Sequence, residues 1–399
     1  MALMTAARWF ALLSFVCVLA TVSAFSNDRS DNLAVYWGQD SGGNQQRLSF
    51  YCDDDTIDAF PLAFLYVFFG KGGKPMLDLS NICSQSGSGS FKGTNLADCS
   101  FLASDIRTCQ AKGKIVTLSL GGATGKVGFN SDSQARGFAR DIWDFFLGGD
   151  SNTRPFGSAV LDGIDLDIES GSSAHYAAFV NELRSFMNVT KSTFNASYYI
   201  TAAPQCPFPD QAIGAALNGA SFDAVYVQFY NNFCESSRPK DFNFDTWDNW
   251  ARKQSPNKNV KVYLGAPGAP SAAGDGYVNI NTLINLAKDA QKRYPSFGGV
   301  MLWDASEARS NNRYDRAIKQ ALVQDQPSRL PTTTVPSRQP GTTREPATTR
   351  APATTLAPAP APSPTTTSFA EPEILRPQRG RVMPQTVIHP NLNSRFFRL

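Results

Sequence analysis

The sequence has very little histidine, and it lacks the short motifs of several common enzyme classes. Only two histidines occur in 399 residues, and no two cysteines are spaced as Cys-x-x-Cys. A zinc site, or any other dedicated metal site of this kind, is therefore not expected. The Gly-x-Ser-x-Gly turn of serine hydrolases is also missing, and His175 is the only histidine between residues 25 and 326, which disfavours a serine hydrolase.

Basic residues do not outnumber acidic residues over most of the chain. Residues 25–326 contain 27 basic and 31 acidic residues, although the whole sequence has a net charge of +3. The excess comes from the C-terminal part, which has nine Arg, no Lys and three Glu from residue 327 onward. Domains that bind nucleic acid usually carry a basic surface, so we expect no nucleic-acid partner for residues 25–326.

Long hydrophobic runs are missing after the first 24 residues. Residues 1–24 contain one Arg, a short apolar stretch and the small residues Val22-Ser23-Ala24. This pattern predicts a cleaved signal peptide and not a membrane anchor, because the apolar stretch is too short to span a bilayer comfortably. We therefore expect a secreted, extracellular protein without a membrane span.

The cysteines and two sequons agree with secretion. Cys17 lies in the leader, and the six cysteines that remain are an even number, which in a secreted chain indicates disulfide bonds. The sequence alone allows fifteen pairings. Asn188 and Asn195 begin the sequons Asn-Val-Thr and Asn-Ala-Ser, and we expect N-glycosylation there. The six cysteines are Cys52, Cys83, Cys99, Cys109, Cys206 and Cys234.

A change in composition divides the chain. Residues 25–326 can form one folded domain, whereas ten Pro and twelve Thr fall between residues 327 and 367. We read residues 327–370 as a Thr/Pro-rich linker that carries O-glycans, because such a composition cannot build a core. Residues 371–399 are predicted to be a basic, disordered tail.

The domain alternates between β-rich apolar runs and helix-like segments. Apolar residues at three- and four-residue spacing predict helices at 133–149, 173–187 and 278–295. Eight strands alternating with helices predict an α/β fold of the (β/α)8, or TIM barrel, type. A doubly wound open sheet is the alternative, but the first predicted strand is not followed by a Gly-rich phosphate turn. The predicted strands cover residues 33–38, 62–69, 114–122, 160–168, 198–204, 224–230, 260–267 and 298–305.

Four acids stand close together in the stretch LDGIDLDIE, residues 161–169. On a strand, side chains alternate between faces, so Asp165, Asp167 and Glu169 share one face. We expect them to point into the barrel, with Glu169 at the C-terminal mouth where barrel enzymes keep their chemistry. Burial and mutual repulsion raise carboxyl pKa values, which suits a general acid. The alternative is a structural or metal-binding acid cluster.

Polar and aromatic residues end two other strands. Tyr226, Gln228 and Tyr230 share one face of the run AVYVQFY, and we expect Gln228 and Tyr230 to contact a ligand while Tyr226 packs in a core layer. Trp303 ends the last strand, where an indole can stack on a sugar ring or simply pack in the core.

These residues resemble glycoside hydrolase family 18. Residues 162–169 match its signature DGxDxDxE, and SLGG at 119–122 matches its SxGG motif. The stretches TAAPQCPFPD (201–210), VQFYNN (227–232) and GGVMLW (298–303) are similar to the hevamine-like class III chitinases of plants and fungi. The resemblance covers about residues 33–320.

The resemblance implies a retaining, substrate-assisted hydrolysis of chitin without a cofactor. Glu169 would be the acid and base, Asp167 would orient the N-acetyl group of the substrate, and Asp165 would share its charge. Tyr230 would bond the acetamido oxygen, and Trp303 would form the floor of the site. The remaining substrate-binding positions that match are Gln228, Tyr36, Phe64, Gln39, Gly121 and Gly122.

The resemblance also implies three disulfide pairs and two cis peptide bonds. The pairs are Cys52–Cys109, Cys83–Cys99 and Cys206–Cys234, and the cis bonds join Ala63 to Phe64 and Trp303 to Asp304. The loop 84–97 departs from the plant enzymes by its length and its Ser/Gly content. Asp304 has no role that the sequence assigns.

The predicted function is a secreted endochitinase, acting as a monomer on chitin or its oligosaccharides and associated with a cell wall. A lectin or inhibitor on the same barrel is the main alternative, but family members of that kind typically lose the acid or the aspartates, whereas Glu169, Asp167 and Tyr230 are all present here. Hydrolysis of peptidoglycan or of N-glycan cores is a third interpretation, because it would use the same central residues.

Overall fold

The computed structural model describes residues 25–194 and 197–324. The predicted signal peptide, the sequon at Asn195, the predicted linker and the predicted tail lie outside these residues. Within the described residues, eight parallel strands form a closed barrel, because β1 pairs with both β9 and β2. The barrel strands are β1 (Asn32–Val35), β2 (Ala59–Val67), β4 (Ile115–Gly121), β5 (Gly163–Asp167), β6 (Tyr199–Ala202), β7 (Ala224–Gln228), β8 (Lys261–Pro267) and β9 (Phe297–Trp303).

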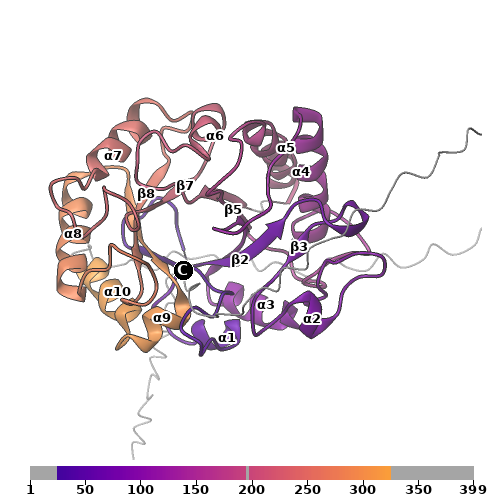
Figure 1. Ribbon diagram of the computed structural model, residues 1–399, viewed down its shortest axis with the longest axis horizontal. Coiled ribbons are helices and arrows are strands. Elements are labelled where there is room, and N and C mark those ends of the chain that lie inside the picture. The colour runs from indigo at the N-terminus through magenta and orange to yellow at the C-terminus, as the bar shows by residue number, and fades with distance from the viewer. Residues whose placement is uncertain (1–24, 195–196, 325–399) are drawn as a thin grey trace, which may run out of the picture. The chain divides into compact units, whose positions relative to one another are not determined.

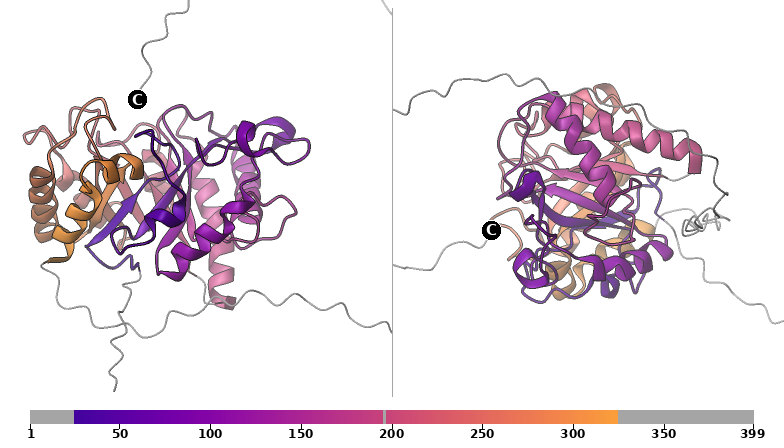
Figure 2. Two further views of the ribbon diagram at one scale, coloured as in Figure 1. Left: turned by 90° about the horizontal axis from the view of Figure 1, so that it is seen from below. Right: turned by 90° about the vertical axis from the view of Figure 1, so that its right-hand side faces the viewer.

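The predicted (β/α)8 barrel is thus confirmed, and each of the eight predicted strands overlaps an observed one. The short strand β3 (Met76–Leu77), which was not predicted, pairs antiparallel with β2. Helices surround the strands (Figure 1), and in a second view the strands lie between α8 to α10 and the helices of the first half (Figure 2). The longer helices are α3 (Ala103–Ala111), α4 (Asp132–Phe146), α5 (Tyr176–Phe194), α7 (Phe244–Lys253), α8 (Ile280–Arg293) and α10 (Tyr314–Gln324).

The remaining helices are short and lie in the loops. They are α1 (Leu48–Tyr51), α2 (Gln85–Ser88), α6 (Gly214–Gly219), α9 (Ala305–Ser310) and the 3₁₀ helices η1 (Lys71–Gly73) and η2 (Ser100–Leu102). The three predicted helices are confirmed as α4, α5 and α8. Side-chain caps fix two of their starts, since Ser131 accepts from the N–H of Gln134 and Asn279 accepts from the N–H of Thr282.

Alternating side chains divide the apolar core into an outer and an inner layer. On β1, Leu33 and Val35 belong to the large cluster between strands and helices, whereas Ala34 and Tyr36 belong to a smaller cluster inside the barrel. The inner cluster is rich in aromatic rings, among them Tyr226 and Tyr263. The site is therefore built on a packed layer of side chains and not on an open pore.

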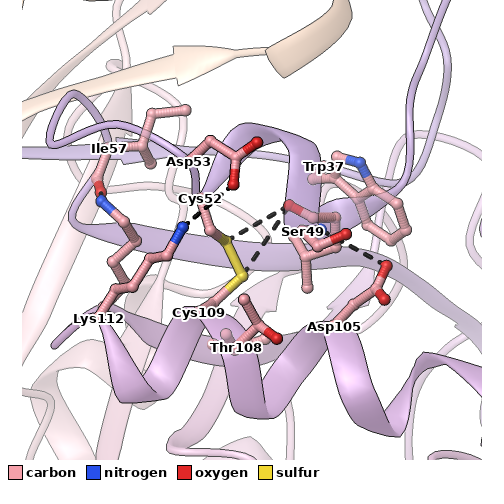
Figure 3. The surroundings of a disulfide bond; sticks show 12 residues. Trp37, Ser49, Cys52, Asp53, Ile57, Asp105, Thr108, Cys109 and Lys112 are labelled. Atoms are coloured by element: carbon pink, nitrogen blue, oxygen red, sulfur yellow. Dashed lines mark hydrogen bonds and ion pairs between the residues drawn. A yellow bond between two sulfur atoms is a disulfide. The ribbon is translucent and has the colours of Figure 1, made fainter.

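The three implied disulfides are all present. Cys52–Cys109 joins the end of α1 to α3, and Figure 3 shows the ion pair between Lys112 and Asp53 beside it. Cys83–Cys99 closes the Ser/Gly-rich loop 84–97. Cys206–Cys234 links the loop after β6 to the loop after β7. Two of these three bonds therefore restrain loops at the C-terminal end of the barrel.

A buried ion pair closes the opposite end of the barrel. Lys319 on α10 donates to the carboxylate of Asp58, just before β2, and to the carbonyl oxygen of Asp31, just before β1. The Asp58 carboxylate also accepts from the N–H of Leu33 at 2.7 Å. The side chains of Lys319 and Asp58 are only 7% and 6% exposed. Each charge therefore needs the other, because an unpaired buried charge is strongly destabilising.

We expect Lys319→Met to lower the free energy of unfolding by about 3–5 kcal/mol, because it leaves the Asp58 carboxylate buried without its cation. Guanidinium unfolding followed by tryptophan fluorescence measures this loss. Lys240→Met is the matched control, since Lys240 is exposed, and it should change stability by less than about 0.5 kcal/mol. Equal stability of the two variants would contradict the role of the pair.

Candidate active site

The acids of the motif lie where strand alternation places them. Asp165 and Asp167 are on β5 and are buried inside the barrel, and Glu169 follows the strand at its C-terminal end, where it is half-buried. Leu166 and Ile168 are buried in the outer layer. The predicted common face of the three acids is therefore present in the structure.

The first acid of the motif, Asp162, does not join the other three. Its carboxylate accepts from the N–H of Val116 at 2.9 Å and from the side-chain amide of Gln110, on α3, at 2.8 Å. The N–H of Tyr199 donates to its carbonyl oxygen. Asp162 thus holds β4, β5, β6 and α3 together at the N-terminal end of the barrel.

Asp165 is held by three hydroxyl groups from three other strands or strand ends. Tyr36 and Ser119 donate to one carboxylate oxygen and Thr201 donates to the other, each at 2.7 Å. Complete burial raises the pKa of Asp165, and these three hydrogen bonds act against that rise. Ser119 and Thr201 were missed as site residues in the sequence, and the register explains why: both face Asp165 across neighbouring strands.

Asp167 and Glu169 form an acidic pair. Burial is the main cause that raises the pKa of Asp167 well above its usual range, followed by the charge of Glu169. Burial also raises the pKa of Glu169. The side-chain amide of Gln228 donates to Asp167 at 2.8 Å and to the carbonyl oxygen of Ala203 at 3.0 Å. Both carboxyl groups therefore hold their protons to a higher pH than ordinary carboxyl groups do.

A fourth carboxylate adds to the local charge. Asp210 is buried and accepts from the backbone N–H groups of Gln205, Ala212 and Ile213 at 2.7–2.9 Å. Its charge contributes to the raised pKa values of both Asp167 and Glu169. The sequence reasoning did not single out Asp210, although it ends the stretch TAAPQCPFPD.

Tyr230 follows β7 and is buried beside the acids. Burial, and then the charges of Asp167 and Glu169, raise the pKa of the Tyr230 hydroxyl well above its usual value. The hydroxyl therefore stays protonated, and can donate a hydrogen bond, up to a higher pH than an ordinary tyrosine. Tyr226, two strand positions before Gln228, packs edge-on against Tyr36 and Tyr263 in the inner layer, as predicted.

Three aromatic rings form one wall of the site. Trp303 stacks on Phe64 with ring centroids 5.7 Å apart and an interplanar angle of 16°. Tyr36, which also bonds Asp165, lies 5.5 Å from Trp303. Trp303 is half-buried. The two implied cis peptide bonds, at Ala63–Phe64 and Trp303–Asp304, are present, and a third precedes Pro209.

The glycines of the SLGG motif allow the backbone to approach the acid strand closely. Gly121 has a φ of 119°, and a Cβ there would lie 2.1 Å from the carbonyl oxygen of Asp167. Gly122 has a φ of 83°, and a Cβ there would lie 2.8 Å from the ring of Phe64. The N–H of Gly122 donates to the Asp167 carbonyl oxygen at 2.8 Å. Both positions therefore require glycine.

The predicted residue Gln39 and the unassigned residue Asp304 both hold the loops around the site. The side-chain amide of Gln39 donates to the carbonyl oxygens of Ala63 and Asp78 at 2.8 and 3.2 Å, which fixes the backbone beside Phe64. Asp304 caps α9 by accepting from the N–H of Glu307, and it also accepts from the N–H of Ser41. Asp304, which had no role in the sequence analysis, thus joins the loop after β1 to the loop after β9.

Other expectations lie away from the site. Asn188 is exposed on α5, where a sequon is accessible. In the described part of the chain, no group of three or more His, Cys, Asp or Glu residues is arranged to hold a metal ion. None of the described helices is long and apolar enough to cross a membrane.

Comparison with known proteins places the site in a family context. The family model for glycosyl hydrolases family 18 matches residues 32–274. "Chitinase 2" of Rhizopus oligosporus is 48% identical over 77% of this chain and 55% of its own length. "Endochitinase" of Saccharomyces cerevisiae is 43% identical over 80% of this chain and 54% of its own length. The chain therefore spans about half the length of these curated relatives.

Two solved plant proteins share the fold at the same sequence identity. The ICChI chitinase from Ipomoea carnea is 35% identical, with a TM-score of 0.62, over 73% of this chain and 99% of its own. The xylanase and alpha-amylase inhibitor protein XAIP-II from Scadoxus multiflorus is also 35% identical, with a TM-score of 0.60, over 72% of this chain and 97% of its own. The fold therefore occurs in proteins described as a chitinase and as an inhibitor.

The raised pKa of Asp167 predicts how stability depends on pH. The native state binds a proton that the unfolded chain, with a carboxyl pKa of about 3.9, has already lost. The Asp167 carboxyl group therefore costs no stability below about pH 3.9, and its own contribution to stability falls as the pH rises from there through the raised native pKa. Asp167→Asn removes this loss, so it should raise the melting temperature at pH 7 more than at pH 4.

Calorimetric melting of both proteins at the two pH values measures the effect. Asp55→Asn is the matched control, because it removes an exposed carboxylate and should give no such gain. An Asp167→Asn protein that melts at or below the wild-type temperature at pH 7 would show that the buried carboxyl does not cause the loss.

Proposed function

Because the chain belongs to glycosyl hydrolases family 18, we propose that it is a chitinase that hydrolyses the β-1,4 bonds between N-acetylglucosamine units of chitin. The observation that carries this proposal is the proton-retaining pair Asp167–Glu169 at the C-terminal mouth of the barrel. The names of the Rhizopus and yeast relatives agree with it. The name of the yeast relative also supports an endo-acting cleavage mode.

In the first step, Glu169 donates its proton to the glycosidic oxygen, and the bond to the anomeric carbon breaks. A carboxyl group with a raised pKa suits this role, because it holds the proton until the leaving oxygen needs it. The N-acetyl carbonyl oxygen of the substrate attacks the anomeric carbon, so the substrate itself supplies the nucleophile. The product of this step is a cyclic oxazolinium ion.

Asp167, Asp165 and Tyr230 stabilise that ion. Asp167 accepts from the acetamido N–H and balances the positive charge, which requires its proton to move toward Asp165. The three hydroxyl donors around Asp165 supply the polar surroundings for that exchange. Tyr230 keeps its proton and donates to the acetamido oxygen. Water then opens the ion with Glu169 as base, and the anomeric configuration is retained.

Trp303 forms the floor beneath the reacting sugar. Its indole is stacked on Phe64 and partly exposed, which leaves an apolar face for the sugar ring. Gln228 orients Asp167, and Tyr36 orients Asp165. The absence of a side chain at Gly121 and Gly122 lets the backbone of the pocket approach the acid strand. Gln39 holds the backbone of Ala63, next to Phe64, by a hydrogen bond.

A lectin or inhibitor function is the second candidate, because XAIP-II shares the fold at 35% identity. Proteins of that kind are expected to lack one of the reacting groups. Glu169, Asp167, Asp165 and Tyr230 are all retained here and are brought together at one site. The retained acids favour hydrolysis, although peptidoglycan or N-glycan cores would use the same residues.

We further propose that the protein is secreted and acts extracellularly at a cell wall as a monomer. The leader (1–24) and the three disulfides, which need an oxidising compartment, support secretion. Residues 25–326 are the catalytic domain, 327–370 the O-glycosylated linker and 371–399 the basic tail. Asn188 and Asn195 carry N-glycans in this proposal.

Glu169→Gln should lower kcat on soluble chitin oligomers by about 10²–10⁴-fold, because it removes the transferable proton and keeps the shape of the side chain. The dissociation constant for the oligomers, measured by calorimetry, should remain within about threefold of the wild-type value. Glu182→Gln, on the outer helix α5, is the matched control and should retain full activity. A wild-type protein that binds chitin oligomers without turnover would support the lectin function.

Truncation after Gln326 should leave kcat on soluble oligomers unchanged, because the linker and tail are proposed to lie outside the catalytic domain. The measurement compares purified full-length and truncated protein on the same oligomer. A large loss of kcat with intact folding would assign part of the site to residues beyond 326.

A further inference from the structure

The position of Tyr230 depends on the backbone that carries it. Its side chain is buried and belongs to the inner cluster of the barrel. Tyr230 directly follows Phe229, in the segment after β7. The contacts of this segment therefore help to determine where the Tyr230 hydroxyl lies.

The next residue, Asn231, bonds this segment to the loop after β8. Its side-chain oxygen accepts from the N–H groups of Gly274 and Asp275 at 2.9 and 3.0 Å. Its own N–H donates to the carbonyl oxygen of Asp275 at 3.2 Å. Asn231 has a φ of 55°, a left-handed conformation that Asn and Asp tolerate better than other residues with side chains.

The same two loops meet again at Gly276. This glycine has a φ of 93°, and a Cβ there would lie 2.6 Å from the Cα of Tyr230. Arg238 bridges the loops as well, since it pairs with the buried Glu235 at 2.9 Å and with Asp275 at 3.2 Å. The loop after β8 therefore packs directly on the backbone of Tyr230.

The opposite side of the segment is fixed by the loop after β6. Asn232 donates to the side-chain oxygen of Gln205 at 3.2 Å, and the disulfide Cys206–Cys234 joins the same two loops. The segment 230–234 is thus held between two loops. On the side of the loop after β8, the side chain of Asn231 supplies two of the hydrogen bonds.

We propose that Asn231 is a positioning residue, which places the Tyr230 hydroxyl by bonding the loop after β8 to the segment after β7. The inference rests on the proposed function for its effect on turnover, because Tyr230 is taken to contact the acetamido group. Asn231 itself touches neither substrate nor acid in this proposal. Its hydrogen bonds are made before substrate binds, so its loss should lower kcat more than it raises KM.

Three substitutions at this position separate the hydrogen bonds from the backbone conformation. Asn231→Asp keeps an acceptor oxygen and tolerates the left-handed conformation. Its kcat should therefore stay within about threefold of the wild-type value. Asn231→Gly relaxes the backbone but removes the acceptor, and Asn231→Ala removes both. We expect each of the last two to lose about tenfold or more in kcat, with KM changed by less than about twofold.

Asn257→Ala is the matched control at the other end of the barrel. Asn257 likewise makes a local turn, accepting from the N–H of Asn259 at 3.0 Å and donating to the carbonyl oxygen of Phe222 at 2.8 Å. It precedes β8, away from the mouth. Asn257→Ala should lower the melting temperature while leaving kcat unchanged, which shows what a merely structural loss looks like.

Hydrogen exchange of the backbone amides in residues 229–236 provides a readout that does not depend on turnover. Exchange should be faster in Asn231→Ala and Asn231→Gly than in wild type, Asn231→Asp or Asn257→Ala. Wild-type kcat in both Asn231→Ala and Asn231→Gly would overturn the inference, as would an equal loss in Asn231→Asp. If the wild-type protein itself does not turn over chitin oligomers, the proposed function fails, and the exchange rates alone decide the positioning role.

Discussion

The site depends on burying several carboxyl groups side by side. Such a cluster is unfavourable unless polar groups surround it and some of its members keep their protons. Here the surroundings come from four different strands or strand ends, in the side chains Tyr36, Ser119, Thr201 and Gln228. The closed barrel is what brings these donors around one strand, so the chemistry of the acids depends on the closure of the fold.

The carboxyl groups at the two ends of the barrel have opposite surroundings. At the N-terminal end, Asp58 pairs with Lys319. Burial alone would raise the pKa of Asp54, but hydrogen bonds from Thr56 and two arginines hold it below its usual range. At the mouth, Asp167 and Glu169 are buried beside other acids, and their pKa values are raised. Stability thus comes from the paired end, while the mouth keeps a transferable proton at the expense of stability.

The sequence predicts those parts of the structure that follow from local periodicity. Alternation along single strands was enough to place Asp165, Asp167 and Glu169 on one inward face, and the strand–helix alternation was enough for the barrel. Ser119 and Thr201 were missed because they become partners of Asp165 only through the register between strands. The disulfide pairs and cis bonds followed from the family resemblance, since spacing alone leaves the pairing open.

Loops were the least predictable part, because their contacts join residues far apart in sequence. Asp304 caps a short helix and also holds Ser41, which no local pattern reveals. Nothing in the local sequence distinguishes Asn231 from an ordinary loop residue. In the structure, its side chain accepts hydrogen bonds from the loop after β8. The family motif therefore predicts the reacting groups, whereas the structure is needed to find the residues that hold them in place.

The central claim is that the substrate's own acetamido group attacks the anomeric carbon while Glu169 supplies the proton. The most direct test is hydrolysis of a chitin oligomer by the wild-type protein, with the anomers of the product followed by NMR in the first minutes, before they equilibrate. The account predicts that the β anomer is released first, because the configuration is retained. Initial release of the α anomer would contradict it, since that result requires direct attack by water on the opposite face of the sugar.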